Sequence, residues 1–453
     1  MVLCLYFLDF VGVPRVKCKI STPLLQYDII IIDMKIAIAS DIYYPMTNGV
    51  AVFAKNLAEG LSRAGHEVIV LCPSFKGRYY RYTDPDTGVT LVHLKSKRFP
   101  LYPDQIEKVP AKKTILGLPM PRLMYRAGIW FAWNPYDKIE EILNKFQPDV
   151  IHLQTAETIA LAIMKYQRKY DVPLVSTGHA YPDNITGQFK ALKPVKKPVD
   201  AVLRTYMASF LKHSEYATMP TEMAIDDLVP QNRRRFKVTV EPLSNGIDLG
   251  CFNPGRAKKT VLEKYGIDMG RLRIINVGRV DPEKSIDKVI EAFTKVVKKL
   301  PEAELLIVGD GIAKNSLEKL VKKLGLEQNV RFTGRVMMPD LVELYRSADM
   351  FATASETETQ GIVLIEAAAC GLPLVAVDAG AVKELCQNRK NGILCKPGDV
   401  DGLARAMVKI LSDTELAEKY GKESLEIAKK HDLSRTLNRF EEIYKTAIAL
   451  NSQ

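Results

Sequence analysis

The sequence has few of the features that mark secreted, metal-binding or membrane-spanning proteins. Its 453 residues include seven cysteines, and no two of them form a C-x-x-C pair. The sequence therefore predicts neither a disulfide framework nor a zinc site, and a reducing cytoplasm fits it best. No stretch approaches the run of about 20 apolar residues that spans a bilayer. The apolar segment Val2–Val13 is short, is interrupted by Asp9 and follows no basic residue, so it is not typical of a signal peptide.

The composition is typical of a packed, soluble chain with two or three domains. Apolar residues make up 47% and charged residues 26%, which excludes a disordered or fibrous protein. Lys and Arg number 64 against 53 Asp and Glu, a net charge of +11. This excess favours an anionic partner and leaves nucleic acid, anionic lipid and a phosphorylated substrate open.

The chain divides into an N-terminal extension and two similar halves. Residues 1–33 show no clean period, so we expect a poorly ordered extension, with Met34 as the true start; the alternative is an N-terminal arm that grazes a membrane. From Met34 onward, short apolar runs alternate with helical patterns, as in parallel β/α units. The cycle restarts at residues 273–278, after a hinge near 245–260.

This pattern predicts an α/β protein with two doubly wound, Rossmann-like domains that face a central cleft. We expect the first domain over residues 34–245 and the second over 246–430. A C-terminal helix at 431–453 can cross back to the first domain. Ligands of such sheets bind at the carboxyl ends of the strands, and the cleft is the natural place for them.

Two segments carry residues suited to a phosphorylated ligand. In segment 358–366, Gly361 opens a helix, and Glu358 and Glu366 lie on either side of it. A helix start offers unpaired N–H groups to a diphosphate, although each glutamate alone would be interpreted as a solvated charge. In segment 277–284, Arg279 and Lys284 follow an expected strand end, where both cations can neutralise a diphosphate.

These segments resemble the GT-B-type retaining glycosyltransferases, the large E-x7-E family that includes phosphatidylinositol mannosyltransferases, glucosyl-diacylglycerol synthases, sucrose synthases and bacterial glycogen synthases. Segment 358–366 matches the E-x7-E signature, and segment 278–284 matches the Gly-Arg…Glu-Lys segment. The interdomain turn 245–248, the Gly-Asp-Gly loop 309–311 and the phosphate loop 44–50 also match. The resemblance runs from Met34 nearly to the end. It implies that the first domain binds the acceptor and the second binds the nucleotide sugar.

The resemblance also implies residue roles, with His179, Glu358, Arg279 and Lys284 as the candidate catalytic residues. Arg279 and Lys284 would hold the donor diphosphate, Glu358 would touch the transferred hexose, and Glu366 would bind ribose hydroxyls. Further donor contacts would come from Gly49, Gly361, Ile362 and Val363, with a nucleotide pocket near Gly334, Arg335 and Val336. His179 matches the active-site histidine of the family; alone, it would be interpreted as a hydrogen-bonded structural histidine.

Two positions depart from the family pattern, and one aspect of the mechanism rests on the family alone. Ser285 stands where relatives usually have Gly, and Ala180 where Thr is common. Retention of the anomeric configuration is implied by the resemblance only. Because no metal cluster or other cofactor is indicated, we expect the two cations and the helix start to stabilise the leaving group. We expect same-face displacement assisted by the departing phosphate, since no carboxylate is identified for a covalent intermediate.

The acceptor is left open by the sequence, although the basic charge gathers in the first domain. Residues 75–126 contain eleven Lys or Arg against four Asp or Glu, and residues 186–213 contain six against one. The second segment starts with Lys190, Lys193, Lys196 and Lys197 and continues with apolar residues at helical spacing. Such a stretch can lie on an anionic membrane surface, or pack its apolar face on its own domain.

We therefore expect a hexosyltransferase that uses a nucleotide-diphosphate sugar of the UDP-glucose or GDP-mannose type. Its acceptor would be a membrane lipid or lipid-linked glycan, reached from the cytoplasmic face by peripheral contact. The alternatives are a soluble-acceptor transferase for a polysaccharide or small glycoside, a sugar-nucleotide-binding regulator, and a GT-B-shaped epimerase. Nucleic acid is not expected, because no recognition motif for it is present. The donor base, the hexose and the linkage stay open.

Overall fold

The computed structural model describes residues 34–44, 46, 48–98, 114–115, 118–119, 130–179, 196–229 and 236–452. The expected extension 1–33 lies outside the described residues. So do Pro45 and Thr47 of the phosphate loop, and Ala180, Lys190 and Lys193 of the acceptor side.

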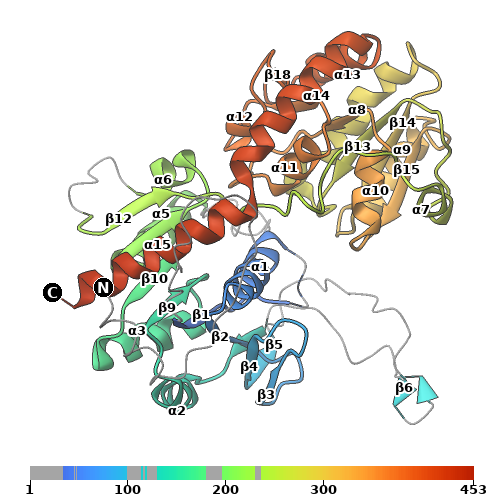
Figure 1. Ribbon diagram of the computed structural model, residues 1–453. Helices are drawn as coiled ribbons and strands as arrows, with labels where there is room; N and C mark the ends of the chain where they lie inside the picture. Colours follow the sequence, from blue (N-terminus) through green and yellow to red (C-terminus); the bar gives the residue numbers. More distant parts are fainter. Residues whose placement is uncertain are drawn as a thin grey trace, which may run out of the picture. The chain divides into compact units, whose positions relative to one another are not determined.

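The first half of the chain forms an eight-stranded sheet in the order β12-β11-β10-β9-β1-β2-β4-β3, parallel except for β3 at the edge (Figure 1). Its strands are β1 (Lys35–Ala39), β2 (Glu67–Pro73), β3 (Tyr80–Thr83), β4 (Thr90–Leu94), β9 (Val150–Leu153), β10 (Leu174–Thr177), β11 (Tyr216–Met219) and β12 (Thr239–Pro242). Its helices are α1 (Gly49–Arg63), α2 (Tyr136–Phe146), α3 (Thr158–Tyr170), α5 (Lys196–Lys212) and α6 (Glu222–Leu228). Two small ribbons, β5–β8 (Ser96–Arg98 with Trp130–Ala132) and β6–β7 (Thr114–Ile115 with Leu118–Pro119), lie outside it.

Both faces of this sheet are buried, because successive side chains along β1 point to opposite faces and all of those from Ile36 to Ala39 are buried. Ile36 and Ile38 belong to a core that includes α1 and the C-terminal helix α15 (Leu433–Asn451), whereas Ala37 and Ala39 belong to a core that includes α2 and α3. Helix α1 begins at a true cap, because the Asn48 side chain accepts a hydrogen bond from the Ala51 amide (3.0 Å). The sheet is therefore covered on both sides, as in doubly wound proteins.

The second half forms a six-stranded parallel sheet in the order β15-β14-β13-β16-β17-β18. Its strands are β13 (Arg273–Val277), β14 (Glu304–Val308), β15 (Val330–Gly334), β16 (Met350–Ala352), β17 (Leu374–Val377) and β18 (Gly392–Cys395). Its helices are α7 (Lys259–Lys264), α8 (Ile286–Val297), α9 (Lys314–Lys323), α10 (Asp340–Arg346), α11 (Ile362–Ala369), α12 (Val382–Leu385), α13 (Val400–Leu411) and α14 (Thr414–Ala428), with 3₁₀ turns at Pro282–Lys284 and Lys429–His431. This strand order is that of a Rossmann fold, so the predicted α/β class with two Rossmann-like domains is confirmed.

The chain passes between the two sheets at two neighbouring places. Residues 244–247 follow β12, and residues 431–433 lead into α15. The Ile247 amide donates to the His431 carbonyl (2.8 Å), and the Leu433 amide donates to the Ile247 carbonyl (2.9 Å). Helix α15 then lies against the first sheet (Figure 1), where the Tyr444 hydroxyl and His152 Nδ1 are 2.7 Å apart. The C-terminal helix therefore contributes to the core of the first domain.

Candidate active site

The residues predicted to bind the donor gather at the switch point of the second sheet. Here the chain runs outward from β13 to β15 and then returns to β16 on the other side of β13. Arg279 and Lys284 follow β13, and Glu358 and Gly361 follow β16. Because β13 and β16 are parallel neighbours, their carboxyl ends place these two loops side by side, where ligands of doubly wound sheets bind.

The Arg279 loop is held by the Gly-Asp-Gly loop after β14. The Val280 amide donates to the Asp310 carbonyl (3.0 Å). A Cβ atom on Gly309 would lie 1.8 Å from the Gly278 carbonyl oxygen, and one on Gly311 would lie 2.3 Å from the Val280 oxygen. Only glycine allows this approach of the two backbones. The loop matches a family motif to which no role was assigned, and in the structure it supports the backbone that carries Arg279.

Both predicted cations contact carboxylates. The Arg279 guanidinium pairs with Asp281 and Glu283 on its own loop. The Lys284 ammonium lies 2.8 Å from Glu358 Oε1, which joins the β13 and β16 loops. Burial tends to raise the pKa of Glu358, but the charge and hydrogen bond of Lys284 outweigh it, and the pKa lies below its usual range. Glu358 is therefore held as an anion beside two cations.

The backbone conformation at Ser285 shows what one departure from the family pattern, Ser in place of Gly, costs the protein. Ser285 has φ of 49° and precedes α8, in the left-handed region that favours glycine. A side chain is tolerated there at some cost. The glycine that relatives usually carry suits the conformation better.

The second glutamate of the signature lies within α11, which starts at Gly361. Gly361 has φ of 82°, and no side chain caps the helix, so the Ile362 and Val363 amides have no partner within it. Glu366 Oε2 accepts a hydrogen bond from the Tyr345 hydroxyl (2.7 Å). Burial raises the pKa of Glu366 to about 7. This carboxyl can therefore change charge near neutral pH.

The predicted nucleotide pocket lies at the same edge of the sheet. Gly334 ends β15 with φ of 70°, and its carbonyl accepts a hydrogen bond from the Gly309 amide (3.0 Å). Arg335 and Val336 follow, and Val336 packs on the core beneath α11. The structure thus brings Gly334, Arg335 and Val336 to the sheet edge that also carries the Arg279 loop.

Two predicted residues of the first domain lie at the carboxyl edge of its own sheet. Gly49 begins α1, and a Cβ atom there would lie 3.1 Å from Ile362 Cδ1 at the start of α11. His179 follows β10; its Nε2 lies 2.8 Å from Gln154 Oε1, and its ring lies 5.1 Å from that of Phe53. Burial lowers the pKa of His179 to about 3, so the ring is neutral. No hydrogen bond or ion pair joins His179 to the donor-side residues that the structure describes.

Gln360 was not singled out from the sequence, although it lies inside the signature. Its Nε2 donates to Ser244 Oγ (2.6 Å), and its Oε1 accepts from the Asn245 amide (3.2 Å). The signature loop is thereby tied to the interdomain turn. No sequence signal could reveal this contact, because the partners are 115 positions apart.

The apolar residues of the basic amphipathic stretch differ in burial. Phe210 and Leu211, close to the end of α5, are buried in the first domain. Nearer the start of the helix, Val202 is 69% exposed and Tyr206 40% exposed. Lys196 pairs with Asp200 (2.7 Å) at the start of the helix, and Lys197 is exposed. The apolar stripe is therefore partly core and partly surface.

Two further observations concern metals and membranes. Across the described ranges, no group of three or more His, Cys, Asp or Glu side chains is placed to hold a metal ion. None of the helices in the described part of the chain combines the length and the apolar character needed to cross a bilayer.

Comparisons with known proteins agree with this geometry. The model of Glycosyltransferase Family 4 matches residues 47–250, and that of Glycosyl transferases group 1 matches residues 257–426. The alpha-monoglucosyldiacylglycerol synthase of Streptococcus pneumoniae is 27% identical over 80% of this chain and 75% of its own.

Solved structures show the same fold. The sucrose-phosphate synthase of Thermosynechococcus elongatus superposes with a TM-score of 0.71 at 19% identity, covering 92% of this chain and 99% of its own. Anabaena HepE in complex with UDP-glucose gives a TM-score of 0.66 at 17% identity, covering 91% and 99%. The strand order, the signature segments and the family matches over both halves agree, and the chain belongs to the group 1 glycosyltransferases of the GT-B fold.

Proposed function

We propose that this glycosyltransferase moves a hexose, with retention of configuration, from a nucleotide-diphosphate sugar to a membrane lipid or lipid-linked acceptor. The observation that carries the proposal is the contact between Lys284 and Glu358 beside Arg279 and the start of α11. Two cations, a carboxylate and free helix amides thus converge at one switch point.

In this proposal, the diphosphate replaces carboxylates that now contact the cations. Arg279 has five N–H donors, so it can turn from Asp281 and Glu283 to fork two phosphate oxygens. Lys284 adds a second charge, and the Ile362 and Val363 amides add hydrogen bonds. Glu358 would accept a hydroxyl of the hexose, and Glu366 the ribose hydroxyls. The site thereby favours the charge that develops on the leaving diphosphate.

The transfer itself would proceed on one face of the sugar. The bond between the anomeric carbon and the phosphate oxygen breaks, and a bond from that carbon to the acceptor oxygen forms. The acceptor proton passes to the departing phosphate oxygen, so no protein base is needed. Neutral His179, held by Gln154, would lie on the sugar side of the donor.

The lipid acceptor is supported by the exposed apolar side chains of α5 and by the Streptococcus pneumoniae relative, whose name describes a glucosyldiacylglycerol synthase. A hollow of about 470 Å³ lies beside these side chains, lined by Ala201, Val202, Thr205, Tyr206 and Ser209. Apolar side chains next to Lys197 are suited to the boundary of an anionic membrane. We propose peripheral contact with the cytoplasmic face.

A soluble acceptor is the second candidate, because the fold is shared with a sucrose-phosphate synthase. The test is a panel of radiolabelled sugar nucleotides, incubated with the protein and a lipid extract. The proposal expects label in the organic phase from one donor. Label only in water-soluble glycoside or polymer would favour the second candidate, and an isomerised donor without an acceptor would indicate an epimerase.

The membrane contact has its own test, with a matched control. Val202→Asp should weaken co-sedimentation with vesicles that contain anionic lipid, because a charge replaces an exposed apolar group. Leu161→Asp changes a similarly exposed apolar residue, 53% accessible on α3, and should have no effect. Equal binding by both variants would remove α5 from the membrane contact.

We also propose that catalysis needs no metal ion, since Arg279, Lys284 and the helix amides can supply the positive charge. Turnover should be unchanged after dialysis against a strong chelator. A loss that Mg²⁺ or Mn²⁺ restores would contradict this part of the proposal.

A further inference from the structure

A second pocket lies at the opposite edge of the second sheet. It is a cavity of about 410 Å³ at the amino ends of β13 and β16, lined by residues 255–257, 262, 269–273, 346, 347 and 349. Its volume falls in the usual range for small-molecule sites, roughly 300–1,000 Å³. The length of β13, about 13 Å at 3.3 Å per residue, separates it from the Arg279 loop. It is therefore distinct from the donor site.

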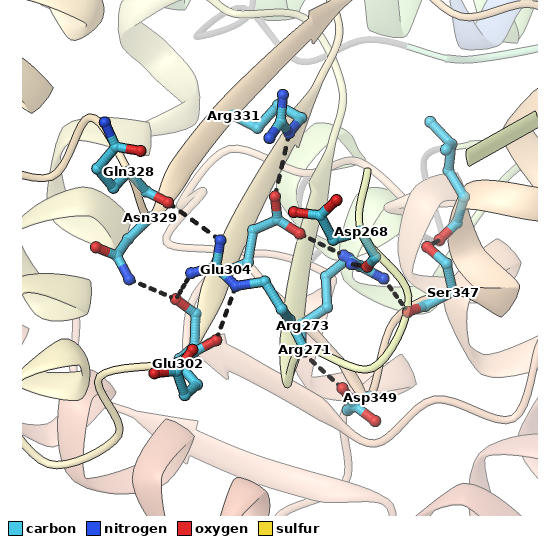
Figure 2. Close-up of polar contacts among 12 residues, drawn as sticks. Asp268, Arg271, Arg273, Glu302, Glu304, Gln328, Asn329, Arg331, Ser347 and Asp349 are labelled. Atoms are coloured by element: carbon cyan, nitrogen blue, oxygen red, sulfur yellow. Dashed lines mark hydrogen bonds and ion pairs between the residues drawn. The ribbon is translucent and has the colours of Figure 1, made fainter. Parts of the chain in front are cut away.

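Most charges around this pocket are balanced within the protein. The buried Arg273 donates from Nε to Glu304 Oε2 (2.8 Å), and Arg331 is the second partner of Glu304 (3.1 Å), as Figure 2 shows. Asp349 accepts a hydrogen bond from the Arg273 amide (2.6 Å). Arg346 pairs with Glu343 (3.0 Å). These groups form a rigid, neutral frame.

Two arginines on the lining have no such balance. Arg271 donates to the carbonyl oxygens of Glu302 (3.1 Å), Ala303 (3.3 Å) and Gln328 (3.1 Å), and it forms no ion pair with any described carboxylate (Figure 2). Arg256 is exposed, and no ion pair or side-chain hydrogen bond joins it to the residues that the structure describes. The carbonyls fix the Arg271 guanidinium in place without neutralising it. The pocket thus carries two uncompensated positive charges.

The backbone between these arginines is open to a ligand. Gly270 has φ of 94°, and a Cβ atom there would meet nothing within 4 Å. The segment that carries Arg256 is anchored three residues earlier, because Arg346 Nε donates a hydrogen bond to the Asn253 carbonyl (3.0 Å). The two free cations therefore stand on fixed backbone at the mouth of a concave site.

We propose that this pocket binds a small phosphorylated molecule, a phosphate monoester whose dianion matches the two free charges. Guanidinium groups pair with phosphate through two parallel hydrogen bonds, which makes arginine the usual residue for this chemistry. The pocket is at the amino ends of the strands, so its ligand does not compete with the donor.

Calorimetric titration of the full chain with inorganic phosphate tests the proposal. Arg256→Ala should weaken binding about tenfold, because one charge-assisted contact is lost while no internal partner is disturbed. Arg271→Gln should act in the same direction, since the amide can still donate to a carbonyl but carries no charge. Arg405→Ala, an exposed arginine of α13, is the matched control and should bind as the unaltered protein does.

A donor-site variant separates this pocket from the active site. Arg279→Ala should retain the phosphate affinity that Arg256→Ala loses. Equal affinities in Arg256→Ala and Arg405→Ala would overturn the proposal. So would loss of phosphate binding in Arg279→Ala alone, because the phosphate would then occupy the donor site.

Discussion

The contact between Lys284 and Glu358 gives a quantitative test of the active site. The two side chains are only 19% and 14% exposed. Lys284→Met removes the cation and leaves a largely buried carboxylate without its main partner. Breaking a buried pair in this way costs about 3–5 kcal/mol, and the remaining exposure reduces our expectation to about 2–3 kcal/mol of unfolding free energy.

A double variant separates stability from catalysis. Glu358→Gln in the Lys284→Met background removes the unpaired charge, so stability should return to within about 1 kcal/mol of the original protein. Activity should not return, because the diphosphate still lacks a charge-assisted contact. We expect kcat/KM for the donor to fall about 10²–10³-fold in both variants, or roughly 2.7–4 kcal/mol of transition-state stabilisation.

Urea unfolding and steady-state kinetics measure these two quantities on the same samples. Lys288→Ala is the control, because it removes a half-exposed lysine of α8 that pairs with Glu291 (3.0 Å), and both quantities should stay nearly constant. If Lys284→Met kept kcat/KM within twofold, or if the double variant regained activity with stability, the pair would be structural and our reasoning wrong.

The pH dependence of this pair has a definite sign. The pKa of Glu358 lies below its usual value, so the pair contributes stability above the ordinary glutamate pKa. That contribution is lost as the pH falls through the lower, folded-state pKa. In Lys284→Met, burial should instead raise the pKa of Glu358 above its usual value, so the sign reverses: the free energy of unfolding should fall as the pH rises through the ordinary glutamate pKa.

Three further predictions follow from single positions. Gly309→Ala should destabilise the protein by about 3 kcal/mol or more in urea unfolding, because the new Cβ meets the Gly278 carbonyl. Gly270→Ala is the control: it is also at positive φ but has open space around it, and should cost about 1–2 kcal/mol. Equal costs would contradict the steric argument. Ser285→Gly should raise the unfolding free energy by about 0.5–1 kcal/mol, and a decrease would show that the left-handed position is not strained. Because the pKa of Glu366 is raised to about 7, the free energy of unfolding should fall as the pH rises from about 4.5 to 7. In the proposed function Glu366 accepts the ribose hydroxyls as a carboxylate, so the donor should bind more tightly over the same interval. Calorimetry should find neither trend in Glu366→Gln.

Much of the fold could be predicted from local patterns in the sequence. The second β/α cycle was predicted to start at residues 273–278, and its first strand, β13, spans Arg273–Val277. The apolar residues of strands and helices repeat every two and every 3.6 positions, so a short stretch of sequence is enough to predict each element. Helix α9 begins at Lys314 and not earlier, because the amides of Ile312 and Ala313 donate to Asp281 and Val280. That tertiary contact could not be read from the helix pattern.

The sequence by itself determined the class of the fold, the family and the residue types that a diphosphate requires. Tertiary structure alone decided which of these groups meet. Lys284 touches Glu358 across 74 positions because β16 returns beside β13, and strand order depends on packing over the whole sheet. The pocket of Arg256 and Arg271 is lined by separate segments of the chain, so no sequence motif could predict it. Local propensity acts along the chain, whereas charge balance and burial depend on neighbours in space.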